Sequence, residues 1–272
     1  MELKSTRLQV NGTTLNVVDV GHGEAVLLLH GFPDTHTVWR KQIPALVSAG
    51  YRVIVPDTRG CGESELMPQV GDYAMRHLVG DIKGMLDVLG LDKVKLVAHD
   101  WGAVIGWNFV MEHPERVQRY VALSVGHPLA YSRAGLGQAL RGYYVMLFQL
   151  RGIAEWLLTA GGWRVFGLLT GFASELPQWR EVLQRPGRLR AHINYYRANL
   201  SMLLRRDYPR VQVPVVGIYS DGDRFLTERQ MQASAEFCDA GFRYEKMEGA
   251  NHWLQLDAPQ RANIMILEGL AA

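Results

Sequence analysis

Three segments of the chain carry side chains that could act together in a covalent hydrolysis. The first, Ala98-His99-Asp100-Trp101-Gly102, has small residues two positions before and two positions after its central aspartate. This spacing is the steric requirement of the nucleophile elbow, a strained strand-to-helix turn that exposes a nucleophile. Here the nucleophile would be a carboxylate instead of a serine hydroxyl. A carboxylate at this position could also simply cap a helix.

The other two segments follow later strand-like runs of the chain. One run ends in the letters SDGD, and the next is followed by GANHW. The order of Asp100, Asp223 and His252 is the nucleophile, acid, histidine order of α/β-hydrolase triads. Asp221 stays open as an alternative acid, because it lies only two residues before Asp223.

A sharp turn follows the apolar run Ala25–Leu29, with the letters HGFPD. The backbone N–H of Phe32 in this turn could form an oxyanion hole together with the N–H of Trp101. Taken alone, the turn would be an ordinary tight turn. Beside the elbow, we interpret it as part of a site.

Two further segments meet the spacing rule of the elbow. They are ALSVG around Ser124 and AYSRA around Ser132. The first leads into a His-Pro pair instead of a helix, and the second has no strand before it. We interpret both as coincidental.

Alternating strand-like and helix-like segments indicate how these residues are positioned. An Asn-Gly pair predicts a hairpin of Arg7–Val10 and Thr14–Asp19 near the start. A helical period places Leu78, Ile82 and Met85 on one face. The predicted fold is α/β, a mostly parallel twisted sheet flanked by helices, with a last helix at Pro259–Leu270. Its strands are Ala25–Leu29, Tyr51–Pro56, Val94–Ala98, Val117–Val125, Val213–Tyr219 and Arg243–Met247.

The alternation of strands and helices stops between residues 127 and 210. We find helical segments there and no convincing strand, so we predict an inserted helical cap (lid) domain at 127–210 on a core formed by 1–126 and 211–272. The insertion holds 12 of the 26 aromatic residues. Such a cap over the sheet edge would build an apolar pocket.

Composition excludes several classes of protein. The chain has 272 residues, a formal charge of +2 and only two cysteines, Cys61 and Cys238, which lie far apart. We therefore expect no zinc or iron–sulfur site, no disulfide scaffold and no nucleic-acid partner, and a reduced, cytoplasmic setting. The most apolar stretch, 142–174, is interrupted by charges and falls short of the roughly 18 apolar residues of a membrane span.

The small net charge hides an uneven distribution. Residues 127–210 contain 12 arginines, no lysine and four acids, a net charge of +8, so the rest of the chain carries −6. Arg-rich exposed helices on an acidic core are the preferred interpretation. A basic cap could also steer acidic substrates or lie against an anionic surface.

Four motifs together resemble the epoxide hydrolases of the α/β-hydrolase superfamily. They are HGFPD at His30, DTRGCGES at Asp57, AHDWGA at Ala98 and NHW at Asn251. This resemblance implies the α/β-hydrolase fold and an aspartyl alkyl-ester intermediate formed by Asp100. His252, oriented by Asp223, would then activate the water that cleaves the ester, with no metal and no organic cofactor.

The same resemblance implies two tyrosine acids in the cap. By register these are Tyr144 and Tyr196, although each sits in a Tyr-Tyr pair. Leu150-Arg151 departs from the family, which often has an acidic residue and proline there. We further expect the epoxide to contact four side chains, those of His30, Pro33, Phe148 and Trp253.

Two alternatives are weighed against this interpretation. A haloalkane dehalogenase would use the same Asp-Trp elbow, with the indole of Trp101 donating to the halide and a second indole from Trp156, Trp163 or Trp179. A hydrolase-fold protein that binds a ligand without turnover has no need of the base His252. The sequence leaves the substrate, its stereochemistry and a homodimer open.

Overall fold

The sheet that carries the predicted site has eight strands within the described part of the chain. The computed structural model describes residues 4–271. The strand order is β1-β2-β4-β3-β5-β6-β7-β8; β2 pairs antiparallel with β1 and β4, and the other neighbours are parallel. The bounds are β1 Ser5–Val10, β2 Thr13–Val20, β3 Ala25–Leu29, β4 Arg52–Pro56, β5 Val94–His99, β6 Val117–Leu123, β7 Val215–Ser220 and β8 Phe242–Met247. The predicted hairpin and the mostly parallel sheet are confirmed.

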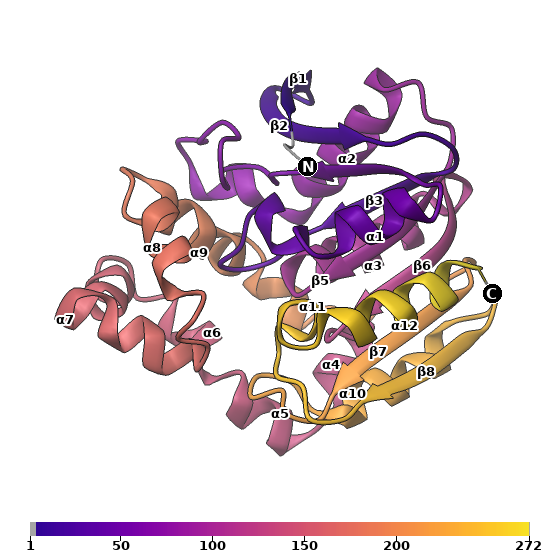
Figure 1. The fold of residues 1–272 in the computed structure, drawn as a ribbon. Helices are drawn as coiled ribbons and strands as arrows, with labels where there is room; N and C mark the ends of the chain where they lie inside the picture. The colour runs from indigo at the N-terminus through magenta and orange to yellow at the C-terminus, as the bar shows by residue number, and fades with distance from the viewer. Residues whose placement is uncertain (1–3, 272) are drawn as a thin grey trace.

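Helices cover both faces of this sheet (Figure 1). α1 (Gln42–Ser48), α11 (Leu254–Asp257) and α12 (Pro259–Ala271) pack together on one face. α2 (Met75–Val88) and α3 (Trp101–Glu112) pack together on the other. Shorter elements in the described chain are α10 Glu228–Gln232 and the 3₁₀ segments His36–Trp39, Val70–Tyr73, Pro114–Arg116, Leu200–Leu203 and Ala233–Phe237.

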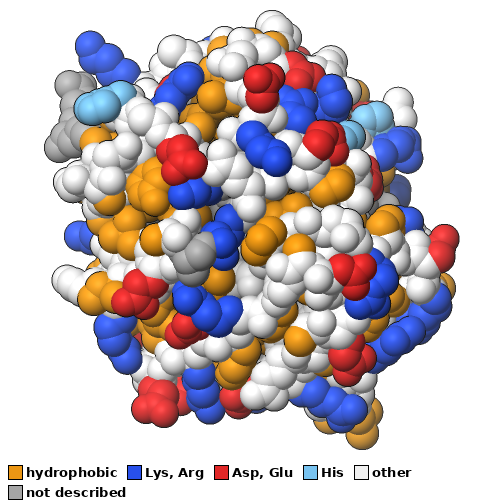
Figure 2. Space-filling view, turned by 90° about the vertical axis from the view of Figure 1, so that its right-hand side faces the viewer, with side chains coloured by type: hydrophobic (Ala, Val, Ile, Leu, Met, Phe, Trp, Pro, Cys, Tyr) orange, Lys and Arg blue, Asp and Glu red, His pale blue; other side chains and the backbone are white. Residues whose placement is uncertain are grey.

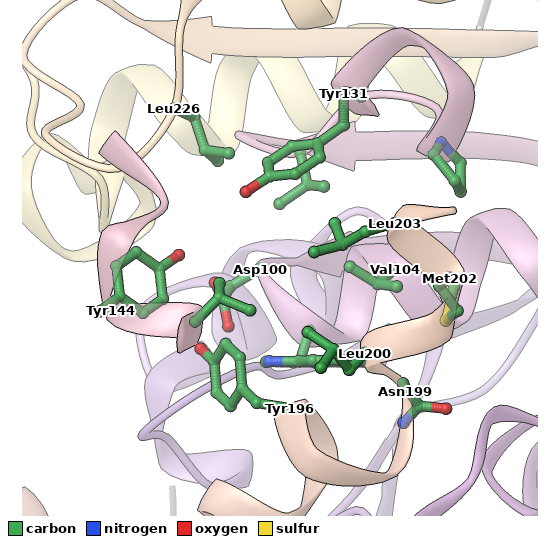
Figure 3. A pocket seen from close by; sticks show the side chains of 15 residues that line it. Asp100, Val104, Tyr131, Tyr144, Tyr196, Asn199, Leu200, Met202, Leu203 and Leu226 are labelled. Carbon is green, nitrogen blue, oxygen red and sulfur yellow. The ribbon is translucent and has the colours of Figure 1, made fainter. Parts of the chain in front are cut away.

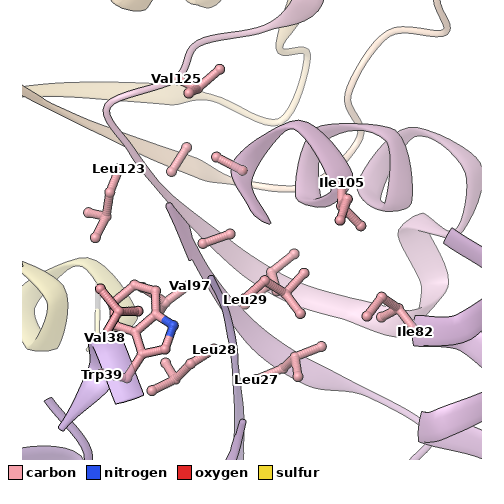
Figure 4. Packing of buried hydrophobic residues seen from close by; sticks show 14 of the residues in the cluster. Leu27, Leu28, Leu29, Val38, Trp39, Ile82, Val97, Ile105, Leu123 and Val125 are labelled. Atoms are coloured by element: carbon pink, nitrogen blue, oxygen red, sulfur yellow. The ribbon is translucent and has the colours of Figure 1, made fainter. Parts of the chain in front are cut away.

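The central strands are apolar along their length because both of their faces are covered. All five residues of β3 are buried. Figure 4 shows Val38 and Trp39 on one side of the strands and Ile82 and Ile105 on the other. This two-sided core explains why β3 shows a continuous apolar run instead of an alternating pattern.

Residues 127–210 contain helices and, among the described residues, no strand. The helices are α4 Pro128–Arg133, α5 Leu136–Arg141, α6 Tyr143–Leu147, α7 Ile153–Thr170, α8 Leu176–Leu183 and α9 Arg188–Ala198. α7 is broken at Ala160–Trp163, where the backbone is not helical. These helices lie beyond the edge of the sheet from which α3 starts (Figure 1). The exact domain limits stay a prediction.

The strand β6 ends two residues earlier than the sequence predicts. The run Val117–Val125 forms a strand only to Leu123, because Ser124 has a φ of +67°, outside the extended region. Ser124 is completely buried. The chain therefore turns sharply at the end of β6, beside the end of β5.

Candidate active site

Asp100 lies at the sharp turn between β5 and α3, with φ +50° and ψ −123°. It makes no capping hydrogen bond with its side chain, so the simple helix-cap interpretation does not describe it. Instead, its Oδ1 accepts a 2.7 Å hydrogen bond from the backbone N–H of Phe32. A Cβ on Gly102 would lie 2.6 Å from the carbonyl oxygen of His30, which explains the small residue after the nucleophile position.

His252 lies between two carboxylates. Its Nδ1 is 2.7 Å from Oδ2 of Asp223, and its Nε2 is 3.5 Å from Oδ2 of Asp100. The other oxygen of Asp223 accepts backbone N–H groups from Phe225 at 2.8 Å and Leu226 at 3.0 Å. The acid is therefore fixed by its own loop, and it in turn fixes the ring of His252.

Asp221, the alternative acid, is engaged elsewhere. It is exposed, and its Oδ1 accepts the backbone N–H of Gly249 at 2.7 Å. The structure therefore brings Asp223 to His252 and uses Asp221 to hold the start of the histidine loop.

The three groups influence each other's protonation. Burial lowers the pKa of His252, but the carboxylates of Asp223 and Asp100 outweigh burial and raise that pKa to about 10. Burial raises the pKa of Asp100, but the imidazolium of His252 and the N–H of Phe32 bring it below its ordinary value. At neutral pH the resting site therefore holds an imidazolium between two carboxylates.

Tyr144 and Tyr196 point their hydroxyl groups toward Asp100 (Figure 3). Their rings meet edge to face with centroids 5.9 Å apart. Burial, together with the nearby Asp100 charge, raises the pKa of both hydroxyls far above the ordinary value, so both remain protonated. Of their sequence neighbours, Tyr143 is 58% exposed, and Tyr195 donates its hydroxyl to the carbonyl of Arg59 at 2.6 Å and lies 3.0 Å from the hydroxyl of Thr58.

Asp100, Tyr144 and Tyr196 line two adjoining cavities. The larger, of about 110 Å³, is mostly apolar and also includes Trp101, Val104, Tyr131, Leu200, Leu203 and Leu226. The smaller, of about 20 Å³, also includes Phe32, Phe148, Thr170, Phe225, His252 and Trp253. The carboxylate thus stands between a wide arm and a narrow arm.

The four expected substrate contacts divide into two groups. Phe148 and Trp253 line the narrow arm. His30 lies outside both arms: it accepts the backbone N–H of Thr58 at 3.0 Å through Nε2. Pro33 lines a separate small cavity against α8. The structure therefore brings Phe148 and Trp253 close to Asp100, whereas His30 and Pro33 lie elsewhere.

Sequence reasoning missed a carboxylate that joins cap and core. Asp34 is buried and accepts the indole N–H of Trp179 in α8 at 2.8 Å and that of Trp253 at 2.9 Å. Burial raises the pKa of Asp34 to about 7. Its position at the end of the HGFPD letters was the only sequence signal.

Two successive backbone carbonyls of the histidine loop, at Asn251 and His252, accept hydrogen bonds from buried side chains. The carbonyl of Asn251 accepts the Ser220 hydroxyl at 2.7 Å. The carbonyl of His252 accepts both the Ser124 hydroxyl at 3.1 Å and Nε2–H of His99 at 2.9 Å. Ser124, which the sequence presented as a coincidental elbow, therefore touches the loop of the candidate base.

The part of the chain that the structure describes contains neither a metal-binding cluster nor a helix that could cross a membrane. Among residues 4–271, no group of three or more His, Cys, Asp or Glu side chains could hold a metal ion. No helix in that part of the chain is both long and apolar enough to cross a membrane.

The fold and the site together define an α/β hydrolase with aspartate at the nucleophile elbow. A family model of the alpha/beta hydrolase fold matches residues 24–259. The chain is 33% identical to epoxide hydrolase A of Mycobacterium tuberculosis, over 97% of this chain and 96% of that protein, and 31% identical to epoxide hydrolase 2 of Siraitia grosvenorii, over 98% of each. It belongs to the epoxide hydrolase family of the α/β hydrolases.

Solved structures of epoxide hydrolases also superpose on nearly the whole of this chain. An epoxide hydrolase A from Mycobacterium thermoresistibile superposes with a TM-score of 0.85 at 26% identity, covering 100% of this chain and 99% of that one. A Bacillus megaterium epoxide hydrolase, solved with an inhibitor, superposes with a TM-score of 0.87 at 27% identity, covering 98% and 100%. The similarity therefore includes the cap as well as the core.

Proposed function

We propose that this protein hydrolyses epoxides to vicinal diols through an ester of Asp100. The observation that carries the proposal is the pair of buried, protonated hydroxyls of Tyr144 and Tyr196 facing that carboxylate. An epoxide needs both a nucleophile at carbon and a proton donor at oxygen, and the two must act from opposite sides. Family membership supports the same activity.

The first step is nucleophilic attack by Asp100. Its Oδ1 accepts the N–H of Phe32, so Oδ2, which lies 3.5 Å from Nε2 of His252, is the oxygen that attacks. As Oδ2 bonds to one epoxide carbon, the C–O bond of the ring breaks and its electron pair stays on oxygen. That oxygen takes the proton of Tyr144 or Tyr196, and solvent later replaces it.

The second step is hydrolysis of the ester. Nε2 of His252 removes a proton from a water, and the hydroxide adds to the carbonyl carbon of Asp100. The negative charge that forms on Oδ1 lies against the N–H of Phe32, and the first N–H of α3, at Trp101, is the expected second donor. Collapse expels the diol, which takes the proton from His252.

The charges around His252 determine its protonation state in each of these two steps. In the resting site two carboxylates raise the pKa of His252 to about 10, so the ring is an imidazolium. Ester formation removes the charge of Asp100 and therefore lowers this pKa, so the imidazolium releases its proton to solvent and becomes a free base for the water. His252 becomes a base when the ester exists.

The positions of the indoles argue against the dehalogenase alternative. Of the three cap tryptophans that could assist Trp101, Trp179 already donates to Asp34 at 2.8 Å, and Trp156 is 69% exposed. Trp163 lines neither of the two cavities beside Asp100. The side chain of Phe32 has no hydrogen-bond donor for a halide, so this residue contributes only its backbone N–H to the site. A pair of tyrosine acids has no task in releasing a halide, which needs no proton.

A substrate panel tests the proposal. Enzyme mixed with styrene oxide should form the diol, and enzyme mixed with 1-bromobutane should release no bromide. A single turnover in ¹⁸O-water should give an unlabelled first diol, because its new oxygen comes from Asp100. His252→Gln should accumulate an adduct of enzyme and epoxide in intact-mass spectra. Halide release without diol, or a labelled first diol, would refute the mechanism.

A further inference from the structure

The outer surface of the cap has an unusual composition between residues 133 and 168, all of which the structure describes. Every exposed residue in this segment is a glycine, an alanine, an arginine or a large apolar residue. The apolar ones include Leu136, Leu140, Tyr143, Met146, Trp156 and Leu168, with exposed fractions between 58% and 75%. We call the exposed side chains of 133–168 the cap face.

The cap face follows one side of consecutive helices. Its residues 136, 140, 143 and 146 are spaced by three or four, which is the spacing of one helix side, and Gly142 alone separates α5 from α6. In Figure 1, α5 lies beside α10, and α6 and α7 continue from it to the far side of the cap. The spacing and the exposure together place 136, 140, 143 and 146 on the solvent side of α5 and α6, and Trp156 and Leu168 are exposed on the two parts of α7.

The charges of the cap face are all positive. Its exposed arginines are Arg133, Arg151 and Arg164. The acid within this segment, Glu155, has a side chain that is 20% exposed and is paired with Arg197 at 2.7 Å. On the face that lies at the right of Figure 1, by contrast, acidic and basic side chains are interspersed (Figure 2). The cap face lacks that mixture.

We infer that the cap face binds an anionic lipid bilayer, with α5 to α7 lying in the plane of the interface. Large apolar side chains enter the acyl boundary, Trp156 and Tyr143 have the amphipathic rings that favour the headgroup level, and the arginines pair with lipid phosphates. A second copy of the chain fits less well. A symmetric dimer on this face would bring arginines of both copies together without a carboxylate of the face to neutralise them.

Docking in this orientation places the bilayer next to the substrate cavity. Tyr143 lies on the cap face, whereas the next two residues of α6, Tyr144 and Val145, line the wide arm. The substrate class would then be lipophilic epoxides that dissolve in the membrane. This last point rests on the proposed function, whereas the docking does not.

Vesicle binding tests the inference. The full chain is mixed with vesicles of phosphatidylcholine alone or with 30% phosphatidylserine, and bound protein is measured by flotation. We expect at least tenfold tighter binding to the anionic vesicles, weakening as salt rises, and a blue shift of tryptophan fluorescence from the exposed Trp156. Trp156→Ser, and Arg151→Glu combined with Arg164→Glu, should each lose about tenfold or more.

Matched changes elsewhere control the vesicle test. Ile264→Ser on α12 and Arg76→Glu on α2 alter exposed residues outside the cap face and should bind like the unchanged protein. All variants should keep their hydrolysis of a water-soluble epoxide, which verifies folding. Equal binding to both vesicle types, or a dimer that Trp156→Ser dissociates without any lipid, would overturn the inference. Vesicle binding by a protein that forms no diol would refute only the proposed function.

A second inference concerns the loop of His252. This inference rests on the proposed function. Ser124 adopts a left-handed backbone, at φ +67°, that few residues other than glycine adopt. Its N–H donates to Ile218 at 2.8 Å, its carbonyl accepts Gln230 at 2.9 Å, and its hydroxyl donates to the carbonyl of His252. The strained turn thus directs the Ser124 hydroxyl toward the loop that carries His252.

The geometry assigns Ser124 and His99 as positioning residues for His252. Both donate to the same buried carbonyl, from the ends of neighbouring strands β6 and β5. Burial and the charge of His252 lower the pKa of His99 to about 3, so this ring stays neutral and keeps Nε2–H as its donor. Together they fix the height of the His252 ring above Asp100.

Steady-state kinetics distinguish positioning from a loss of fold. Without the hydroxyl, Ser124→Ala should slow ester hydrolysis about tenfold while leaving ring opening unchanged, so kcat and KM fall together and kcat/KM stays constant. Ser124→Gly, which relieves the strained φ, should show the same loss. A fall of kcat/KM in step with kcat, or unchanged kinetics, would overturn the assignment. Absence of any adduct in His252→Gln would instead refute the proposed function.

Discussion

At the scale of single residues, the site combines opposite requirements in a very small space. In the proposed mechanism, Asp100 must be ionised to attack, and Tyr144 and Tyr196 must keep their protons. The structure meets both requirements by placing His252 beside the carboxylate and by burying the hydroxyls. Each residue can therefore be tested by the step that it serves.

Tyr196→Phe should slow ring opening more than ester hydrolysis, because the hydroxyl donates only to the departing epoxide oxygen. We expect a loss of about tenfold or more in adduct formation, since general acids contribute at least that much. Rapid-quench mass spectrometry measures both steps. Tyr143→Phe, at an exposed tyrosine, is the control and should behave as the unchanged protein. Equal slowing of both steps would mean that Tyr196 is structural.

Asp100→Asn should lower the pKa of His252. In the unchanged protein that pKa is raised to about 10, and Asp100 contributes to the rise, so the neutral amide should bring the titration toward lower pH. Imidazole NMR signals followed from pH 5 to 11 would measure the shift. The same midpoint in both proteins would contradict the proposed timing of the base.

At the scale of elements, the turn after β3 and the start of α3 are packed too closely to accept a side chain between them. A Cβ on Gly31 would lie 2.6 Å from the backbone nitrogen of Trp101 and would collide with the side chain of Asp100. The contact joins the backbone of the turn after β3 to the first backbone nitrogen of α3, so one of these two backbone segments would have to move to relieve it. The proposed oxyanion donors, the N–H groups of Phe32 and Trp101, therefore depend on glycine at this position.

Gly31→Ala should reduce kcat by about a hundredfold, the typical cost of losing one oxyanion donor. Gly137→Ala is the matched control, because an added Cβ there meets nothing within 4 Å. Circular dichroism would verify that both variants fold. Normal turnover by Gly31→Ala would show that the turn does not set the oxyanion geometry.

At the scale of the whole molecule, the contact of Asp34 with Trp179 and Trp253 joins the cap to the core. Its folded-state pKa is raised from 3.8 to about 7, so this group favours the folded state fully below pH 3.8 and loses that contribution between pH 3.8 and 7. Asp34→Asn removes the titration. The melting temperature of this variant, relative to the unchanged protein, should therefore rise from pH 4 to pH 7 and stay level above.

Differential scanning calorimetry at several pH values measures this difference, and Asp92→Asn, at an exposed carboxylate, serves as the control. A constant difference between Asp34→Asn and the unchanged protein across this range would contradict the prediction.

The parts of the fold and of the site that could be predicted from the sequence are those that depend on local spacing. The turn at Asp100 and the loops of Asp223 and His252 follow strands, so their positions at one sheet edge could be inferred. The bonds of Asp34 join residues 145 and 219 positions apart, which no local pattern reveals. The segment around Ser124 was dismissed because it lacks a following helix, yet its small neighbours reflect the same need for a left-handed turn at a strand end.

The unequal arms beside Asp100 have a consequence for handedness. An epoxide with one bulky and one small substituent fits only with the bulky group in the cavity of about 110 Å³ and the small one in that of about 20 Å³. Two mirror-image epoxides seated in this way present different carbons to Oδ2. The enzyme should therefore consume one enantiomer of such a racemate first, and chiral chromatography of the unreacted epoxide would reveal which one remains.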